Sequence, residues 1–414
     1  MIHTDPSSAI GSFATPAKAT SPSTGVPVAA RLLFALLERL VHGAVCISTP
    51  DGHRFRFGNS TEPAVDLFIA DWALARDVLT GGDVAFAEAY IDGRWGTSDL
   101  TRLLTVLARN QAVLTRAFYG GMLQRVAYRL RHWMRRNTRE QARRNIAAHY
   151  DLGNDFYRLW LDPTMTYSSA LFEGDPGRTL DVAQDAKYDR ILAELELPPG
   201  AHILEIGCGW GGFAERAARR GYQVTAISLS SAQTEFARAR LANAGLGDRA
   251  QFHLRDYRDE HGRYQGVASI EMFEAVGEKW WPTYFGKVRE TLAPGGRACI
   301  QTITMADERF DQYRAQSDFI QQYIFPGGML ASPSRFAQEV DRAGLAVERK
   351  LRFGRDYAET LRRWLGAFER RIGAVRAQGF DERFIRCWRF YLAYCTAGFD
   401  SDSTDVGQFT LVAR

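Results

Sequence analysis

Cysteine is scarce in this sequence of 414 residues, and none of its five cysteines belongs to a Cys-x-x-Cys pair. They stand far apart in the chain, as Cys46, Cys208, Cys299, Cys387 and Cys395. Without paired spacing, the sequence predicts neither a zinc site nor a disulfide framework. We therefore expect an intracellular protein with reduced thiols and no bound metal.

Long hydrophobic runs are also missing. The most apolar N-terminal stretch, residues 32–47, is interrupted by Glu38, Arg39 and His42 and is too short to span a membrane. Before it, 13 of the first 30 residues are Pro, Ser or Thr, and Phe13 is the only aromatic residue there. This composition predicts a disordered tail over residues 1–30 and does not match a signal peptide.

The formal net charge is only +4, but basic residues are concentrated in one segment. Residues 116–144 contain nine arginines against one acidic residue, Glu140, and apolar residues recur among them at helical spacing. A basic amphipathic helix of this kind suits an anionic membrane surface. Nucleic acid is the competing polyanion, but no nucleic-acid module accompanies the segment, and we expect no such partner. A solvated linker helix between domains remains the plainest alternative.

The length predicts two domains joined by this segment. We expect a disordered tail at 1–30, a small α+β domain at 31–115, a basic amphipathic linker at 116–145 and a larger α/β domain at 146–414. In the small domain, leucines at helical spacing predict a helix over residues 31–42. The alternating residues 53–57, which follow a Pro-Asp-Gly turn, predict a hairpin.

The larger domain is organised around residues 202–213, in which an apolar strand runs into a glycine cluster and then into a helical pattern. Strands and helices alternate from there, which predicts a doubly wound, mostly parallel sheet. A strand over residues 345–353 and a last edge strand over residues 408–412 should complete it. Polar or glycine residues fall at or near the carboxyl ends of the central strands, where ligands bind in such sheets: Gly207, Ser228, Asp256, Glu274 and Gln301.

Two details of the glycine loop narrow its meaning. Glu205 lies in the strand two residues before Gly207, and the spacing is Gly-x-Gly-x-Gly. This arrangement resembles the S-adenosylmethionine loop of class I methyltransferases, in which the acidic residue helps to position the loop and the methionine end of the cofactor. A structural glycine turn in another α/β enzyme is the alternative.

Further motifs appear in one order along the chain. They begin at His149 (HYDLGNDFY), Met165 (MTYSSA), Glu205 (EIGCGWGG), Met272 (MFEAVG), Phe353 (FGRDYAETL) and Tyr391 (YLAYCTAGF). Together they resemble the cyclopropane-fatty-acid synthase family over residues 35–414. The resemblance implies a class I methyltransferase domain with a seven-stranded doubly wound sheet, and a smaller N-terminal α+β domain on the lipid side.

The family adds a carbon from S-adenosylmethionine to a cis double bond in the acyl chain of a membrane phospholipid. The resemblance therefore implies a cytoplasmic enzyme, peripheral on the inner face of the membrane, and it is compatible with a homodimer. Carried over by motif, Tyr167 and Ser168 would contact the cofactor, and Glu205, Gly207, Cys208 and Gly209 would lie at its methionine end. Ser228 and Gln233 would meet the ribose, and Asp256 and Tyr257 would lie near the adenine.

The family's chemistry also implies a base. An alkene is a poor nucleophile, so the methyl donor must be held close to it in a dry tunnel. Removal of a proton after methyl transfer gives a cyclopropane ring or a methyl- or methylene-branched chain. In the family, a bicarbonate ion is held by a Cys, a Glu, a His, a backbone group near an Ile, and a Tyr.

This sequence matches that set in part. Glu274, Ile303 and Tyr357 stand where the Glu, Ile and Tyr are expected. Ser169 replaces the Cys and Gln301 replaces the His. Both can donate hydrogen bonds to an anion, but Gln cannot relay a proton as His does. These changes weaken the expectation of cyclopropane formation more than that of methyl transfer.

Each candidate also has a structural interpretation. Glu274 is also typical of a salt-bridged helix cap, and Tyr357 of a core tyrosine. Cys395 matches a cysteine proposed as catalytic in the family, although a buried apolar role is favoured. His149 either lines the substrate entrance or is a hydrogen-bonded structural histidine. Two rival functions remain: an N-methyltransferase acting on a small amine, and a non-catalytic lipid-binding protein.

Overall fold

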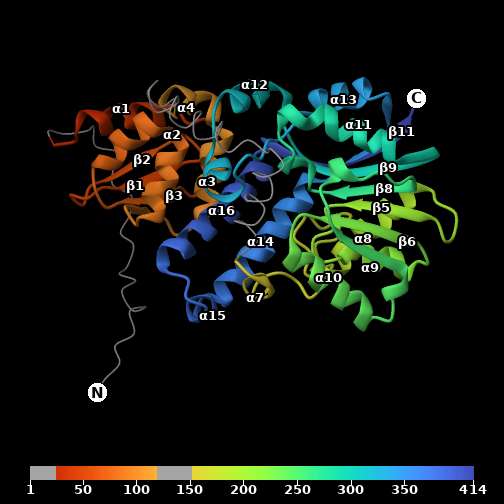
Figure 1. Ribbon diagram of the computed structural model, residues 1–414. Coiled ribbons are helices and arrows are strands. Elements are labelled where there is room, and N and C mark those ends of the chain that lie inside the picture. The colour runs from red at the N-terminus through yellow and green to blue at the C-terminus, as the bar shows by residue number, and fades with distance from the viewer. Residues whose placement is uncertain (1–24, 119–151) are drawn as a thin grey trace, which may run out of the picture.

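The computed structural model describes residues 25–118 and 152–414 (Figure 1). Most of residues 1–30, for which a disordered tail was predicted, nearly all of the predicted linker, and His149 lie outside the described residues. The described chain builds two sheets, one of four strands near the N-terminus and one of seven strands in the remainder.

The N-terminal region, residues 25–118, combines a four-stranded sheet with helices on its inner side. Its elements are α1 (Val28–Leu37), β1 (Val45–Ser48), β2 (Arg54–Phe57), β3 (Val65–Ile69), α2 (Ala73–Ile91), β4 (Trp95–Gly96), α3 (Leu100–Arg109) and α4 (Gln111–Phe118). β1 pairs antiparallel with β2, which confirms the predicted hairpin. α1 begins and ends earlier than expected, and α2 kinks at Gly82, where φ is 65°.

The seven-stranded sheet has the order β10-β11-β9-β8-β5-β6-β7. Its strands are β5 (His202–Ile206), β6 (Gln223–Ser228), β7 (Ala250–Leu254), β8 (Tyr264–Ile270), β9 (Leu292–Met305), β10 (Leu345–Arg352) and β11 (Thr404–Ala413). The strands from β5 to β9 all run parallel to one another, while β11 is antiparallel to both β9 and β10. The expected doubly wound sheet is confirmed.

Helices cover both faces of this sheet (Figure 1). On one face lie α8 (Leu180–Leu195), α9 (Gly212–Arg219) and α10 (Ser231–Asn243), and on the other lie α11 (Trp281–Thr291) and α13 (Pro333–Arg342). Each face has its own buried apolar cluster between sheet and helices. The expectation that residues 408–412 form an edge strand is wrong, because β11 inserts between β9 and β10. The chain returns from the helical C-terminal segment, and its last strand pairs antiparallel with both neighbours.

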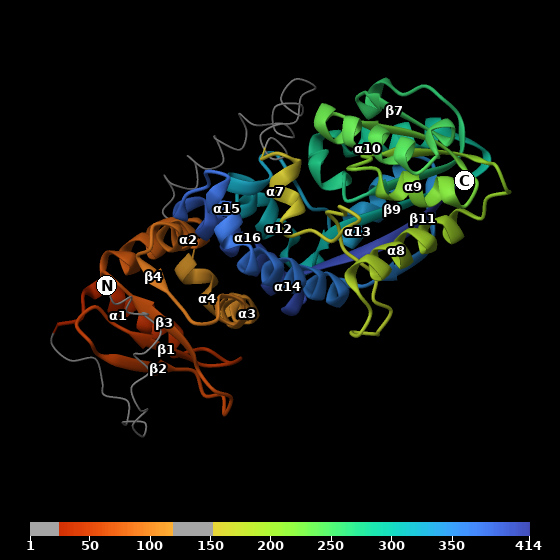
Figure 2. The same ribbon diagram turned by 90° about the horizontal axis from the view of Figure 1, so that it is seen from below.

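Two C-terminal helices leave the sheet and pack against the N-terminal region (Figure 2). They are α14 (Gly354–Arg370) and α16 (Glu382–Asp400), with the short α15 (Ile372–Ala377) between them. Arg386 of α16 donates to the carbonyl oxygens of Tyr90 and Trp95, at 2.6 and 3.0 Å. Phe390 lies against the rings of the same two residues. The two regions therefore share one continuous apolar core.

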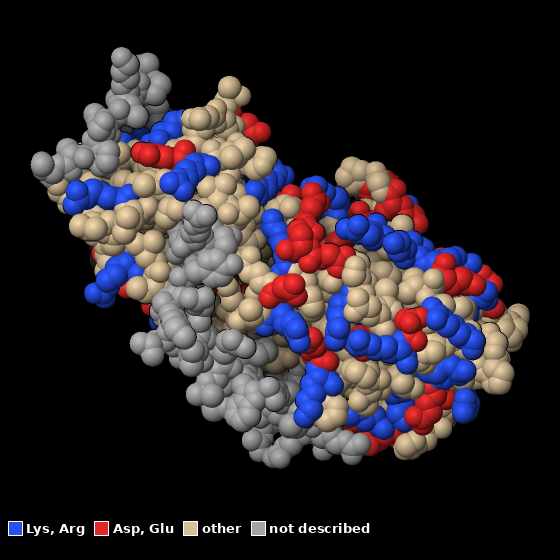
Figure 3. Space-filling model, turned by 90° about the horizontal axis from the view of Figure 1, so that it is seen from above, with Lys and Arg blue, Asp and Glu red and all other residues tan. Residues whose placement is uncertain are grey.

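Among the described residues, no helix combines the length and the apolar character that crossing a membrane requires. On the face shown in Figure 3, basic and acidic side chains are interspersed over the described surface. Charged side chains of the described residues also form ion pairs, for example Arg216 with Asp185 and Asp189.

Candidate active site

Two cavities meet beside the carboxyl ends of the parallel strands. The smaller one, of about 170 Å³, lies along the loop after β5 and the ends of β6 and β8. The larger one, of about 390 Å³, is enclosed by helices of both regions of the molecule. Tyr167, Glu271 and Ala275 line both cavities, so these residues form the boundary where a molecule in one cavity would face a molecule in the other.

The smaller cavity is bounded by all ten residues to which the sequence assigned cofactor contacts. The backbone N–H groups of Gly207 and Cys208 donate to the carbonyl oxygen of Ile227, which closes the loop onto β6. Gly207 has a φ of 88°, and a Cβ there would come within 2.7 Å of the Met272 side chain. Glycine is therefore required at this position by both backbone conformation and space.

The buried carboxyl of Glu205 supports the fit to S-adenosylmethionine. Its Oε2 atom is buried and no described residue donates a hydrogen bond to it, and the residue borders the smaller cavity. Burial raises the pKa of Glu205 well above its usual value. A cationic amine brought into the cavity would supply the missing donor and favour the ionised carboxylate. The residues present therefore fit the methionine end of this cofactor.

Other predicted cofactor residues are held by local contacts. Lys187 Nζ donates to the Ser168 hydroxyl at 2.6 Å, and the Ser228 hydroxyl accepts from the Ser230 N–H at 3.1 Å. Asp256 forms a buried, bidentate ion pair with Arg258, with distances of 2.8 and 2.6 Å. The Asp256 carboxylate is thus already paired, and the arrangement positions Arg258 beside the expected adenine end.

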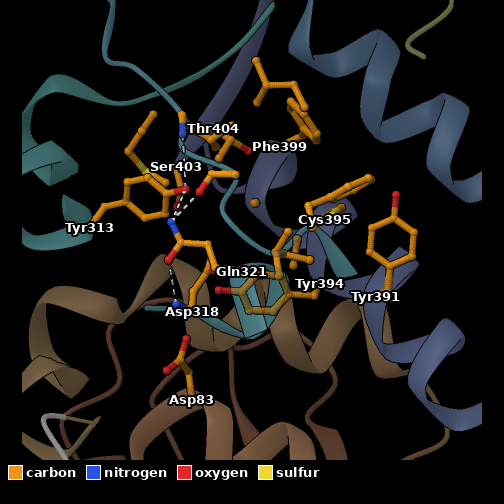
Figure 4. A pocket seen from close by; sticks show the side chains of 18 of the residues that line it. Asp83, Tyr313, Asp318, Gln321, Tyr391, Tyr394, Cys395, Phe399, Ser403 and Thr404 are labelled. Atoms are coloured by element: carbon orange, nitrogen blue, oxygen red, sulfur yellow. Dashed lines mark hydrogen bonds between the residues drawn. The ribbon is translucent and has the colours of Figure 1, made fainter. Parts of the chain in front are cut away.

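The larger cavity is mainly apolar. Its N-terminal side is lined by Phe86, Leu104 and Leu107, and its C-terminal side includes Leu361 and Phe390. Tyr391, Tyr394 and Cys395 belong to α16, and Figure 4 shows them facing the larger cavity. Burial raises the pKa of the Cys395 thiol, so this cysteine stays neutral at the cavity wall. A long apolar ligand suits such a cavity.

The residues expected to hold bicarbonate instead bind Glu271, a carboxylate of the chain itself. Glu271 Oε1 accepts from the Ser169 backbone N–H and from Gln301 Nε2, both at 2.8 Å. Glu271 Oε2 accepts from the Tyr357 hydroxyl at 2.6 Å. The Ser169 hydroxyl does not contribute, because it donates to the Ala170 carbonyl oxygen.

Glu274 and Ile303, the remaining two members of the expected set, form a hydrogen bond with each other. Glu274 Oε1 accepts from the Ile303 N–H at 2.6 Å and from the Thr302 hydroxyl at 3.0 Å. Glu274 Oε2 is buried and has no hydrogen-bond partner among the described residues. The donors of the expected set are thus already used, by the two glutamates and, for the Ser169 hydroxyl, by the Ala170 carbonyl. This donor set does not fit a separate bicarbonate ion.

The two glutamates differ in their electrostatic surroundings. Burial raises the pKa of Glu274 to about 8, and the charge of Glu271 acts in the same direction. Burial also raises the pKa of Glu271, but Lys187, Tyr357, Gln301 and the Ser169 N–H oppose that effect. When the surroundings of two carboxyls separate their pKa values, one can act as an acid and the other as a base. Glu271, whose carboxylate accepts three hydrogen bonds, is therefore the better candidate for the base, and Glu274 for the protonated member.

A chain of amides fixes the orientation of Gln301. Arg190 Nη1 donates to Gln408 Oε1 at 2.7 Å, and Gln408 Nε2 donates to Gln301 Oε1 at 3.0 Å. Because a guanidinium can only donate, each amide in turn must present its NH₂ group toward the active site. Gln301 therefore faces Glu271 with a donor.

Lys187 lies behind the same site on α8. Burial lowers the pKa of its ammonium to about 7, while Glu271 and Asp162 favour the charged form. No residue of this supporting group (Glu271, Lys187, Gln408 and Thr302) was predicted from the sequence. Of these four, only Glu271 has a sequence position that could have suggested a role in the site, because it directly follows β8 and precedes Glu274 by three residues. Its backbone has a φ of 49°, a left-handed conformation that is uncommon for Glu.

Comparison with known proteins finds relatives that match most of the chain. The family described as mycolic acid cyclopropane synthetase matches residues 137–409. Tuberculostearic acid methyltransferase UfaA1 of Mycobacterium tuberculosis is 40% identical over 427 residues, which cover 98% of this chain and 97% of the relative. Cyclopropane-fatty-acyl-phospholipid synthase of Escherichia coli K12 is 31% identical over 377 residues, which cover 85% and 92%.

A solved structure agrees with these matches. Mycolic acid cyclopropane synthase CmaA1, complexed with SAH and CTAB, aligns with a TM-score of 0.61 at 32% identity, covering 65% of this chain and 97% of that chain. The family resemblance is thereby confirmed, and S-adenosylmethionine is the cofactor. The chain belongs to the mycolic acid cyclopropane synthetase family of S-adenosylmethionine-dependent methyltransferases.

Proposed function

We propose that this enzyme transfers a methyl group to the cis double bond of an unsaturated phospholipid acyl chain, that Glu271 accepts the released proton, and that the product is a methyl- or methylene-branched chain. The observation that carries the proposal is the position of Glu271, which lines both the cofactor cavity and the apolar cavity. S-adenosylmethionine supplies an electrophilic methyl group when it is bound.

The boundary residues position and shield the reaction. Tyr167 and Tyr391 are linked through their hydroxyls at 2.6 Å, and both border the apolar cavity. Aromatic faces held in this way can stabilise a cationic carbon in the acyl chain. The apolar walls exclude water, which would otherwise capture that carbon.

The hydrogen bonds of Glu271 determine which oxygen takes the proton. Oε1 already accepts two N–H donors, whereas Oε2 accepts only the Tyr357 hydroxyl. A hydroxyl can rotate and become an acceptor, but an amide N–H cannot. Protonation at Oε2, with Tyr357 turning to accept, therefore keeps the other two bonds intact.

The lipid substrate is supported by the apolar cavity and by the relatives. The E. coli relative is named a fatty-acyl-phospholipid synthase and the mycobacterial one a tuberculostearic acid methyltransferase. The mycobacterial relative covers nearly all of this chain, so we favour a branched product. A cyclopropane product is the second candidate, because Glu271 lies beside the cofactor cavity, where it could take a proton from the transferred methyl.

The test is to incubate the purified enzyme with S-adenosylmethionine and dioleoyl phospholipid vesicles, then to analyse the acyl chains. We expect a mass increase of one methylene unit, with the vinylic proton signal of a branched methylene group. A strongly shielded ring-methylene signal would instead establish the cyclopropane product. Acyl chains of unchanged mass, from enzyme that binds S-adenosylhomocysteine, would refute the proposed function.

A further inference from the structure

One cation borders the apolar cavity, and the proposed chemistry does not use it. Of the described residues that line the cavity, Arg309 is the only Lys or Arg. It lies on α12 (Asp307–Ala315), beside α4 at the junction of the two regions (Figure 1). Its Nη1 donates to the Gln111 side-chain oxygen of α4 and to the Ser403 hydroxyl before β11. Three separate segments therefore meet at this guanidinium.

Arg309 is half-buried but has no acidic partner. Within residues 25–118 and 152–414, no Asp or Glu forms an ion pair with it, although neighbouring Glu308 favours its charge electrostatically. Both of its hydrogen-bond partners are neutral. By contrast Arg314, on the same helix and 56% exposed, forms an ion pair with Glu278 at 2.8 Å.

A partly desolvated guanidinium without a counter-ion is costly, and a bidentate oxyanion is its natural complement. Two neutral partners leave several of its five donors available for such a group. The remaining polar end of the cavity is acidic: Asp83 and Asp318 lie there, and Figure 4 shows Ser403 on the opposite side of the cavity from Asp83. An anionic group would therefore be directed toward Arg309 and away from the two carboxyls.

We propose that Arg309, oriented by Gln111 and Ser403, binds the phosphodiester of the lipid substrate while one acyl chain fills the apolar cavity beside Glu271. This inference rests on the proposed function and deepens it by naming the group that the enzyme recognises at the polar end of the lipid. It also gives the N-terminal region a direct role, because α4 supplies one of the residues that hold the guanidinium.

The experiment compares four proteins: the wild type, Arg309→Gln, Arg309→Lys and the matched control Arg314→Gln. Each is assayed on dioleoyl phosphatidylglycerol, dioleoylglycerol and free oleate, presented in the same nonionic micelles. S-adenosylhomocysteine affinity and the thermal midpoint are measured for each protein as folding controls. The control removes the same charge from the same helix, outside the cavity.

We expect Arg309→Gln to lower kcat/KM on phosphatidylglycerol at least about tenfold, mainly through KM, because hydrogen bonds to charged groups are the strong ones. Conversion of dioleoylglycerol should not change. Arg309→Lys should recover part of the loss, since it keeps the charge but not the fork. Arg314→Gln should behave as the wild type.

Three results would overturn the inference while leaving the proposed function standing. They are an equal loss on phosphatidylglycerol and dioleoylglycerol, no loss on either, and a loss confined to oleate, which would assign a carboxylate to Arg309. Failure of the wild type to convert any of the three lipids would overturn the proposed function and this inference together.

Discussion

The two cavities of this enzyme are built in contrasting ways. The smaller one is formed by loops that follow neighbouring parallel strands, and its walls carry closely placed polar groups. The larger one is enclosed by helices from distant parts of the chain, and its walls are mainly apolar. The first can recognise a ligand through directed hydrogen bonds, whereas the second selects by shape and volume. Substitutions in the two cavities should therefore change different measured properties of the enzyme.

The largest effect is expected at the boundary that the cavities share. Glu271→Gln removes the proposed base but can keep the surrounding hydrogen bonds. Its amide oxygen can accept from the Ser169 N–H and from Gln301, and its NH₂ group can donate to the Tyr357 hydroxyl once that hydroxyl turns. We expect kcat to fall by about 10² to 10⁴, the usual contribution of a general base. Calorimetry should show S-adenosylhomocysteine affinity within about threefold of the wild type, since hydrogen bonding to the cofactor is left in place.

Glu274→Gln is the matched comparison. Because burial raises the pKa of Glu274 to about 8, its carboxyl is protonated at neutral pH, and Gln resembles that form. We expect kcat to fall by less than about tenfold, well below the loss of a general base. If Glu274→Gln proved as damaging as Glu271→Gln, the division of the pair into acid and base would be wrong.

The next effect belongs to the cofactor side alone. Gly207→Ala would force a Cβ to within 2.7 Å of Met272 and strain a backbone with a φ of 88°. We expect S-adenosylhomocysteine affinity to fall about tenfold or more, since strain of this kind costs about 1 to 3 kcal/mol. Gly200→Ala, at a φ of 79° with open space around it and outside both cavities, should lower the thermal midpoint without changing the affinity.

A smaller effect should follow from reversing the amides behind the boundary. In Gln408→Glu, the new carboxylate keeps its bond to Arg190 but can no longer donate to Gln301. Gln301 should then rotate and turn its oxygen toward Glu271, which destabilises the ionised carboxylate and raises its pKa. We expect about a tenfold loss of kcat on the acidic limb of the pH–rate profile, because one pKa unit corresponds to that factor.

The pH–rate profile distinguishes this effect from a general loss of structure. Its acidic limb should move to higher pH in Gln408→Glu, so that activity recovers as the pH rises. A uniform loss at every pH would contradict the proposed role of the amide chain.

The smallest effect lies at the far end of the apolar cavity. Burial raises the pKa of Asp83 to about 6 and that of Asp318 to about 7, and the charge of Asp83 also opposes ionisation of Asp318. Their stabilising neutral forms are fully present below the unfolded pKa near 4 and are lost as the pH rises through 6 and 7. Between pH 5 and pH 8 we expect the free energy of unfolding to fall by about 1 kcal/mol through Asp83 and by about 2 to 3 kcal/mol through Asp318.

Urea titrations at the two pH values measure this fall. Asp83→Asn should reduce the pH dependence, and Asp311→Asn, on the exposed side of α12, should leave it unchanged. If the wild type and Asp83→Asn both became more stable between pH 5 and pH 8, and by the same amount, the proposed effect of the buried carboxyls would be excluded.

Much of the cofactor side could be predicted from the sequence because its residues are close together in the chain. The strand, glycine loop and helix around Gly207 are local patterns, and parallel strands bring their carboxyl ends to one edge. The family resemblance grouped Glu274 with Ile303, and the two form a hydrogen bond. The role of each residue in binding or catalysis remains a prediction.

The apolar side could not be predicted in this way. Its walls come from α2, α3, α14 and α16, which local periodicity cannot place against one another. The position of β11 inside the sheet also depends on long-range pairing. Glu271 was missed because a glutamate after a strand looks like a surface residue, and its left-handed backbone is visible only in the structure.

The covalent attachment of the Glu271 carboxylate has a physiological consequence. An enzyme that borrows a dissolved anion depends on the carbonate content of its surroundings and loses that anion in acidic, degassed media. Here the anion is encoded in the polypeptide and held by Ser169, Gln301 and Tyr357. If Glu271 serves as the proposed base, we expect the activity of this enzyme not to depend on the supply of carbon dioxide.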